Sequence, residues 1–166
     1  MLSVSLTPKA SLFQGHGLSY TTYKYSQLRL NASTIGPCDA VGVTVSVRNT
    51  GGRDGEEVVQ VYAKQPEASV PVPRVRLVAF ERVSIAAGAT ATVELSVEPE
   101  THAAVLDNDD DDDIYDGREA VVVEKGVVQL FVGGGQPDFA QRMGQPAPLA
   151  ANVTVSSQAT VASCGL

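Results

Sequence analysis

The sequence predicts an all-β sandwich of about seven strands in a single domain. Short segments in which apolar and polar residues alternate recur along the chain, and clusters of Gly, Pro, Asn and Asp separate them. No stretch shows the 3.6-residue period of a long amphipathic helix. With 166 residues, of which 43% are hydrophobic, the chain is long enough to bury a sizeable core.

The first expected strand spans residues 20–30 and follows a sharp loop. Glycines on both sides of His16 permit backbone angles that are closed to other residues, and Gly36-Pro37 breaks the pattern after the strand. Aromatic and β-branched residues at 20–23 favour a pleated, half-buried surface. The apolar residues that this strand contributes are Tyr23, Tyr25, Leu28 and Leu30.

Residues 41–48 show the strictest alternation in the chain. One face carries Val41, Val43, Val45 and Val47, and the other carries Thr44, Ser46 and Arg48. A turn over residues 49–55 follows, rich in Asn, Gly and Asp. Residues 56–64 then return as a strand, and we expect the two segments to form a hairpin with a seven-residue loop.

The remaining strands are expected at 75–85, 90–98, 120–123 and 127–132. Three prolines make residues 65–74 a connection, residues 86–89 form a short turn, and the last two strands pair around Glu124-Lys125-Gly126. The one helical candidate, residues 100–106, is short. Seven short alternating strands are typical of an immunoglobulin-like or fibronectin type III-like sandwich.

This pattern divides the chain into three regions. Residues 1–14 are expected to be a linker or the remnant of a preceding domain, and residues 15–138 are the sandwich, with an acidic loop inserted at 107–117. Residues 139–166 lose the alternation and predict an irregular C-terminal extension, in which residues 152–155 could add an edge strand.

The charge is concentrated in one place. Six of the 19 acidic residues lie at Asp107 and 109–113, and without them the remaining 13 nearly balance the 12 basic residues. A nearly neutral body argues against nucleic acid as a partner. The acidic run reads as a solvated loop, because Ile114 and Val123 stand where an EF-hand would need oxygen ligands. We therefore expect neither a metal site nor a cofactor.

Targeting and covalent features follow from a few residues. No apolar run approaches the length of a membrane span, and residues 1–9 lack the pattern of a signal peptide, so an exported chain would take its signal from elsewhere. Cys38 and Cys164 could form one disulfide or both be free; their spacing cannot decide, and free or unresolved thiols are the working expectation. Asn31 and Asn152 begin N-glycosylation sequons, which matter only in a secreted protein.

Four ordered blocks of sequence resemble a known domain, the C-terminal fibronectin type III-like domain of glycoside hydrolase family 3 enzymes. The blocks are Gly15-His16-Gly17-Leu18-Ser19-Tyr20-Thr21, residues 45–62 with Asp54-Gly55-Glu56-Glu57, Arg74 with Phe80-Glu81-Arg82-Val83, and Val132-Gly133-Gly134-Gly135-Gln136-Pro137. Together they cover most of residues 13–138. The last block is similar to the form found in β-xylosidase-type members, and the acidic run departs from the pattern as an insertion.

The resemblance implies a non-catalytic accessory domain of a secreted β-xylosidase or β-glucosidase, active in carbohydrate and xylan metabolism. The family's catalytic carboxylates lie in domains upstream of this one, so no catalytic residue is carried over. The domain would pack on the catalytic domains, stabilise them and edge the active-site cleft. The residues expected to make that contact are Phe13, Gly15, His16, Gly17, Leu18, Ser19, Tyr20 and Tyr23.

The residues themselves offer no chemistry that would replace the missing domains. Glycoside hydrolysis needs two carboxylates facing one another, and Glu56 and Glu57 point to opposite faces of an extended segment. A nucleophile elbow is absent, and neither His16 nor His102 has an evident partner. The alternative is a stand-alone carbohydrate-binding or adhesion module for oligo- or polysaccharides, although the chain has no Trp, four Phe and five Tyr to serve as stacking platforms.

Overall fold

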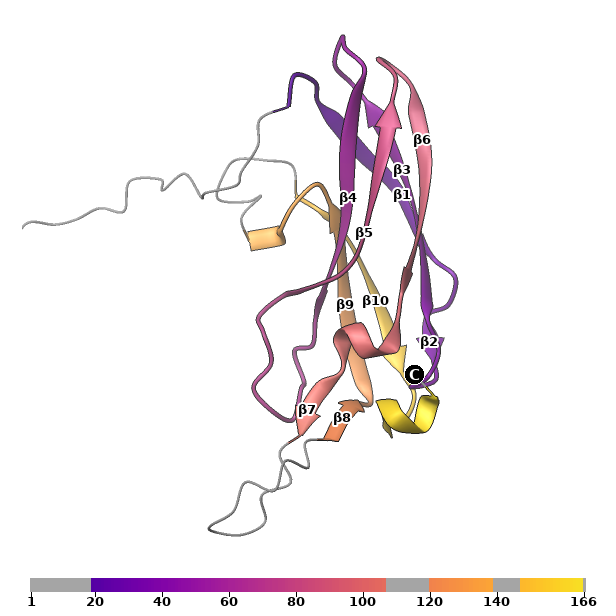
Figure 1. Ribbon diagram of the computed structural model, residues 1–166, viewed down its shortest axis with the longest axis vertical. Helices are drawn as coiled ribbons and strands as arrows, with labels where there is room; N and C mark the ends of the chain where they lie inside the picture. Colours follow the sequence, from indigo (N-terminus) through magenta and orange to yellow (C-terminus); the bar gives the residue numbers. More distant parts are fainter. Residues whose placement is uncertain (1–18, 107–119, 139–146, 166) are drawn as a thin grey trace, which may run out of the picture.

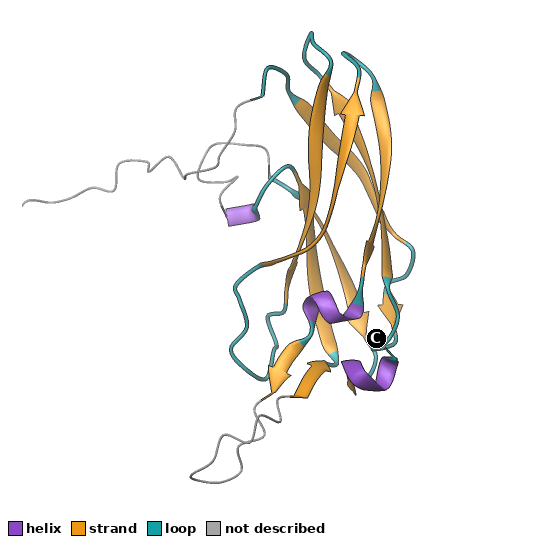
Figure 2. Ribbon diagram, viewed as in Figure 1, coloured by secondary structure: helices purple, strands orange, loops and turns teal. Residues whose placement is uncertain are grey.

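The computed structural model describes residues 19–106, 120–138 and 147–165. Within them it shows a sandwich of two mainly antiparallel sheets with a small third sheet at one end (Figures 1 and 2). The three-stranded sheet has the order β1 (Tyr23–Leu30), β3 (Val41–Asn49), β6 (Thr90–Val97). The five-stranded sheet has the order β2 (Thr34–Ile35), β10 (Leu149–Val155), β9 (Gly126–Gly133), β4 (Gly55–Lys64), β5 (Arg76–Ile85). The all-β prediction is confirmed.

The small sheet closes the lower end of the molecule in Figure 1. Its order is β11 (Ala159–Thr160), β8 (Ala120–Val123), β7 (Ala104–Leu106). Two single-turn 3-10 helices accompany it, η1 (Pro99–His102) and η2 (Val161–Cys164). The expected helix over residues 100–106 is therefore a 3-10 turn followed by a short strand.

Valines facing inward from both sheets make the core. The predicted inner face of β3 is buried throughout, and its β6 neighbours Val93, Leu95 and Val97 are buried as well. From the five-stranded sheet, Val59, Val61, Leu130, Val132 and Val153 meet them. Each such side chain contributes about 1.5–3 kcal/mol when removed from water, so this contact between the sheets holds the sandwich together.

An irregularity in β1 keeps its apolar residues on one face. The pairing with β3 shifts register between Ser26 and Arg29, and Gln27 has a φ of 55°. The extra residue means that Tyr23 and Tyr25 before the bulge, and Leu28 and Leu30 after it, all pack against the core. The prediction of these four apolar contributors is confirmed.

Two expected pairings are wrong. Residues 41–48 and 56–64 do not form a hairpin, because β3 and β4 belong to different sheets and the 50–54 loop crosses between them. Likewise β8 does not pair with β9 but with β7 and β11. Alternation shows which side of a strand faces the core, and it does not show which strand lies beside it, so a loop between sheets looks the same in the sequence as a wide hairpin.

The C-terminal part is more ordered than predicted. Within the described residues 147–165, β10 pairs with β9 over seven residue pairs and with β2 in parallel, and Val153 and Val155 join the core. The alternative that residues 152–155 add a strand is confirmed, although β10 lies between β2 and β9 and is not an edge strand. Ala, Asn and Thr on the other positions of β10 weakened the apolar signal in the sequence.

Cys38 and Cys164 form a disulfide, so the working expectation of free thiols is wrong. Their Cα atoms lie 5.3 Å apart across a sequence separation of 126 residues. The parallel pairing of β2 with β10 brings the two cysteines together, since Cys38 follows β2 and η2 follows β10. That pairing could not be read from the spacing of the cysteines.

Among the described residues, no helix is long and apolar enough to cross a membrane.

Candidate interdomain surface

The segment that leads into β1, residues 19–22, is the described part of the predicted contact region, and we call it the lead-in segment. It lies at the upper end of the sandwich in Figure 1. Tyr20 is 93% exposed, whereas the next residue, Thr21, is buried. The segment therefore holds one side chain inward and presents an aromatic ring to the surroundings.

Asn49, at the end of β3, fastens the lead-in segment to the sandwich. Its side chain is fully buried, and Oδ1 accepts hydrogen bonds from the Thr21 hydroxyl at 2.5 Å and from the Gly51 N–H at 3.0 Å. Its Nδ2 donates to the carbonyls of Arg53 at 2.8 Å and Ile85 at 2.9 Å. One amide thus satisfies four partners, so the lead-in segment is held in a fixed position.

The carboxylate of Glu57 lies between the two sheets, close to the lead-in segment. Glu57 begins the inward-facing row of β4 that continues with the buried Val59 and Val61. The Tyr25 hydroxyl, from the other sheet, donates a 2.6 Å hydrogen bond to Glu57 Oε1. Both residues are only half-buried, so this polar pair lies where the core opens toward solvent.

Two further residues complete this group. The Tyr23 hydroxyl is buried and has no hydrogen-bond partner among the described residues. Gly134, just beyond β9, lies against the Glu57 carboxylate, and a Cβ at this position would collide with Oε1 and come within 3.3 Å of the Tyr25 hydroxyl. We call Tyr23, Tyr25, Glu57 and Gly134 the tyrosine–glutamate cluster.

Burial shapes the electrostatics of this cluster. Desolvation raises the pKa of Glu57 above its usual range, and the hydrogen bond from Tyr25 offsets only part of that rise. Desolvation and the neighbouring Glu57 carboxylate raise the pKa of both tyrosines as well. The cluster therefore holds a carboxylate whose negative charge the protein itself stabilises poorly.

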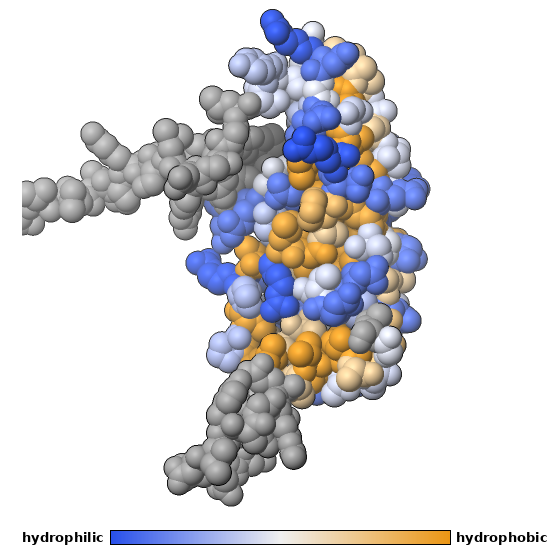
Figure 3. Space-filling model, viewed as in Figure 1, coloured by the Kyte–Doolittle hydropathy of each residue, from blue (hydrophilic) through white to orange (hydrophobic). Residues whose placement is uncertain are grey.

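The outer face of the five-stranded sheet is a second exposed apolar area, visible as orange atoms in Figure 3. Leu77 is 45% exposed and Phe80 is 66% exposed. In a regular strand these two residues, three positions apart, would lie on opposite faces. Val78 is an extra residue opposite the Val61–Tyr62 step of β4, and this bulge turns both Leu77 and Phe80 outward.

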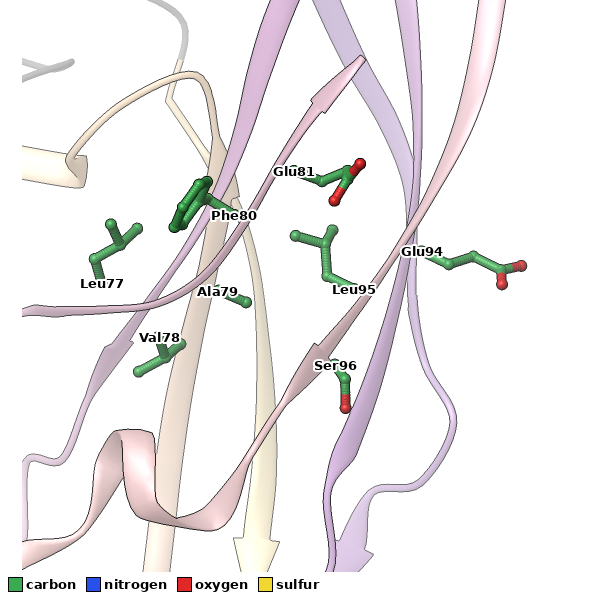
Figure 4. A pocket seen from close by; sticks show the side chains of 8 residues that line it. All are labelled: Leu77, Val78, Ala79, Phe80, Glu81, Glu94, Leu95 and Ser96. Atoms are coloured by element: carbon green, nitrogen blue, oxygen red, sulfur yellow. The ribbon is translucent and has the colours of Figure 1, made fainter.

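A shallow groove of about 360 Å³ runs between β5 and β6, where the two sheets separate (Figure 4). Leu95 and Ala79 form its apolar floor. Phe80 points to the other side of β5 and Glu94 points away from the groove. Since the aromatic ring and the carboxylate do not converge, the groove lacks the arrangement of a sugar-stacking platform with polar partners.

The two sequons occupy different surroundings. Asn31 lies between β1 and β2, is exposed, and accepts a 3.0 Å hydrogen bond from the Gly42 N–H. Asn152 is exposed on the outer face of β10, opposite Gln129 of β9. Both side chains are reachable from solvent, and their glycosylation stays a prediction.

The structure brings together only some of the predicted contact residues. Ser19, Tyr20 and Tyr23 lie in or beside the lead-in segment. Phe13, Gly15, His16, Gly17 and Leu18 lie outside the described residues, as do residues 1–14 and the acidic loop. Sequence reasoning missed Tyr25, Glu57 and Gly134; the only signal for them was a glutamate at an inward position of a strand pattern and three consecutive glycines.

The described residues give little support for metal binding or for acid–base catalysis. No three His, Cys, Asp or Glu side chains there come close enough to hold a metal ion. Glu56 and Glu57 diverge, because Glu56 lies on the outer face and pairs with Arg82 at 2.8 Å. His102 is buried under Arg76, and burial lowers its pKa, with the charge of Arg76 adding to that effect. Burial therefore favours the neutral form of this ring, whose Nδ1 has no hydrogen-bond partner among the described residues.

The sequence is similar to a known family of domains and to several enzymes. The model of the fibronectin type III-like domain matches residues 57–136. A probable β-glucosidase I from Aspergillus fumigatus is 36% identical over 124 residues, which are 72% of this chain and 14% of that protein. A β-xylosidase from Formosa agariphila is 40% identical over 90 residues, which are 54% of this chain and 12% of that protein.

Solved structures of β-glucosidases contain a part with a similar fold. The structure of β-glucosidase 3B from Thermotoga neapolitana in complex with α-D-glucose matches with a TM-score of 0.67 and 28% identity, over 88% of this chain and 17% of that one. The chain therefore spans less than a fifth of the length of these relatives. Residues 57–136 are a fibronectin type III-like domain, and the chain is similar to the corresponding part of glycoside hydrolase family 3 β-glucosidases and of β-xylosidases.

Proposed function

We propose that this chain is the non-catalytic accessory domain of a glycoside hydrolase of the β-glucosidase or β-xylosidase type, and that it packs on the catalytic domains and stabilises them. The observation that carries this proposal is the coverage. Most of the chain matches a domain that makes up 17% of a solved β-glucosidase and 12% of a β-xylosidase. The substrate is a β-glucoside or β-xyloside, taken from the names of these relatives.

The lead-in segment is the part of the described surface that we assign to the contact. Tyr20 is the most exposed large apolar side chain there, and Asn49 holds the segment rigid through the buried Thr21. Tyrosines combine a large apolar area with few rotatable bonds, which makes them common anchors of interfaces. A rigid mount lowers the entropy lost when such an anchor is buried. In the assembled enzyme this contact would edge the active-site cleft.

The absence of converging acidic groups supports a non-catalytic role. In the described residues, Glu56 and Glu57 lie on opposite faces of β4, and the groove between β5 and β6 does not gather a pair of carboxylates. Hydrolysis of a glycosidic bond needs two carboxyl groups about 5–10 Å apart around the sugar. The catalytic pair would come from the accompanying domains.

We infer that the domain works outside the cytoplasm. The Cys38–Cys164 disulfide supports this location, since such bonds persist mainly in oxidising compartments. The exposed sequons at Asn31 and Asn152 are compatible with a secretory route.

A fusion enzyme tests the proposal. The full chain would replace the corresponding domain of the Thermotoga neapolitana β-glucosidase 3B, and activity on 4-nitrophenyl β-glucoside would be followed during heating. We expect the fusion to keep its activity at temperatures where the enzyme without that domain loses it, and the chain alone to release no nitrophenol. A fusion no more stable than the deleted enzyme would contradict the packing role.

Two variants locate the contact. Tyr20→Ala should shorten the half-life of the fusion, whereas Phe80→Ala, which removes the exposed aromatic ring on the outer face of β5, should leave it unchanged. The reverse result would move the contact to the outer sheet face. Binding of the isolated chain to soluble xylan or β-glucan on affinity gels would instead favour the stand-alone carbohydrate-binding module.

A further inference from the structure

We propose that the carboxylate of Glu57 receives the guanidinium or ammonium group of a basic side chain from the catalytic domains, an inference that rests on the function proposed above. The tyrosine–glutamate cluster would thus be the charged part of the interdomain contact, beside the apolar anchor Tyr20.

The first argument is the shortage of partners around the carboxylate. Among the described residues, only the Tyr25 hydroxyl lies within hydrogen-bond distance of Glu57, and no basic nitrogen lies within 4.0 Å of it. An ionised carboxylate has about four acceptor positions. Most of this acceptor capacity is therefore available to a group from outside the described residues.

The second argument is the contrast with the neighbouring residue. Glu56 points outward, is exposed to solvent, and nevertheless has both Arg82 at 2.8 Å and the Ser84 hydroxyl at 3.3 Å as partners. Glu57 is more buried and has fewer. A half-buried carboxylate without a counter-ion costs free energy in the isolated domain, and groups with such a cost persist where they serve a function.

The third argument is the shape of the site. The Glu57 carboxylate meets the Tyr25 hydroxyl across the space between the two sheets. Within its own sheet Glu57 is paired with Val83 of β5. Gly134 leaves room for the carboxylate, since a Cβ there would collide with it. The φ of Gly134 lies outside the left-handed region, so other residues could adopt its backbone conformation, and the glycine serves to leave space beside the carboxylate. Tyr25 and Gly134 together therefore hold and accommodate the Glu57 carboxylate at this position.

The test compares two substitutions in the isolated full chain and in the fusion with the Thermotoga neapolitana catalytic domains. Glu57→Gln removes the charge and keeps an oxygen acceptor for Tyr25. Glu81→Gln is the matched control, because Glu81 is an exposed carboxylate of the adjacent strand with no ion pair in the described structure. Urea unfolding is measured for the chain, and the rate of thermal inactivation for the fusion, both at pH 7.

The effect of Glu57→Gln on stability should be opposite in the isolated chain and in the fusion. Glu57→Gln should raise the urea midpoint of the isolated chain and yet make the fusion lose activity about tenfold faster, while Glu81→Gln changes neither. If Glu57→Gln leaves the inactivation rate unchanged while Tyr20→Ala accelerates it, the proposed contact stands and the inference about Glu57 is overturned. A wild-type fusion no more stable than the deleted enzyme overturns both.

Discussion

The hydroxyl of Tyr25 donates a 2.6 Å hydrogen bond to Oε1 of Glu57, and this bond joins the two sheets beside the point where the chain enters the sandwich. Buried valines continue the inward-facing row of β4 that Glu57 begins, and the lead-in segment ends directly before β1, which carries Tyr25. The bond therefore lies between the buried core and the surface that we assign to the interdomain contact.

The charge of Glu57 makes the isolated chain less stable at neutral pH. Because the pKa of Glu57 is raised on folding, the folded state favours the protonated form, and that advantage is complete below the usual value of 4.5 and lost as pH rises through the folded-state pKa. Glu57→Gln should be more stable than the wild type at pH 7 by less than about 1 kcal/mol, because solvent screens the half-exposed carboxylate. Urea unfolding at several pH values should show the difference vanishing toward pH 4; a constant difference would contradict this explanation.

A side chain at Gly134 should displace the Glu57 carboxylate from Tyr25. Gly134→Ala places a methyl group against Glu57 Oε1, and it should cost about 0.5–1.5 kcal/mol, the usual net contribution of one hydrogen bond. Gly135→Ala is the control, because no atom lies within 4 Å of a Cβ there. The cost of Gly134→Ala should shrink in a Glu57→Ala background, and additive effects in this double-mutant cycle would show that the two residues do not meet.

His102 should make the chain sensitive to mild acid. Its pKa is lowered on folding by burial and by Arg76, while Glu100 opposes the shift, so the folded state favours the neutral ring. Stability is then complete above the usual pKa of 6.5 and falls as the pH decreases through it. The melting temperature should decline between pH 7 and 5 in the wild type and in His16→Ala, and much less in His102→Leu. An equal decline in all three would assign it to other groups.

The disulfide should contribute strongly to stability. Cys38 and Cys164 close a loop across 126 residues, and cross-links of native proteins typically contribute about 2–4 kcal/mol. The double variant Cys38→Ser, Cys164→Ser should unfold at a lower urea concentration, and a thiol reductant should lower the midpoint of the wild type to a similar value. An intact mass that corresponds to two free thiols in oxidising buffer would contradict the bond itself.

Much of the fold could be predicted from the sequence, for reasons that particular residues show. The four valines of β3 and the inner row of β6 alternate without interruption, because each faces a core on one side only. The bulges at Gln27 and Val78 interrupt that period, so the faces of Leu77 and Phe80 could not be assigned. The sequence pattern could not predict which strands belong to which sheet, because strand pairing depends on contacts between segments that are distant in the sequence.

The contact surface was only partly predictable. The exposed Tyr20 could be anticipated from the block that includes residues 15–21, which resembles a known domain. The tyrosine–glutamate cluster could not, because Tyr25, Glu57 and Gly134 come from three strands or strand ends that meet only through the topology. The Cys38–Cys164 bond depends on the same kind of long-range placement.

Amide hydrogen exchange tests the central claim most directly, by comparing the isolated chain with the fusion to the Thermotoga neapolitana catalytic domains. Packing through the lead-in segment and the tyrosine–glutamate cluster predicts slower exchange at residues 19–25 and 55–58 in the fusion, with no change around Val105 and Val121 in the small sheet. Equal exchange at residues 19–25 in both proteins, or new protection only around Leu77 and Phe80, would contradict it.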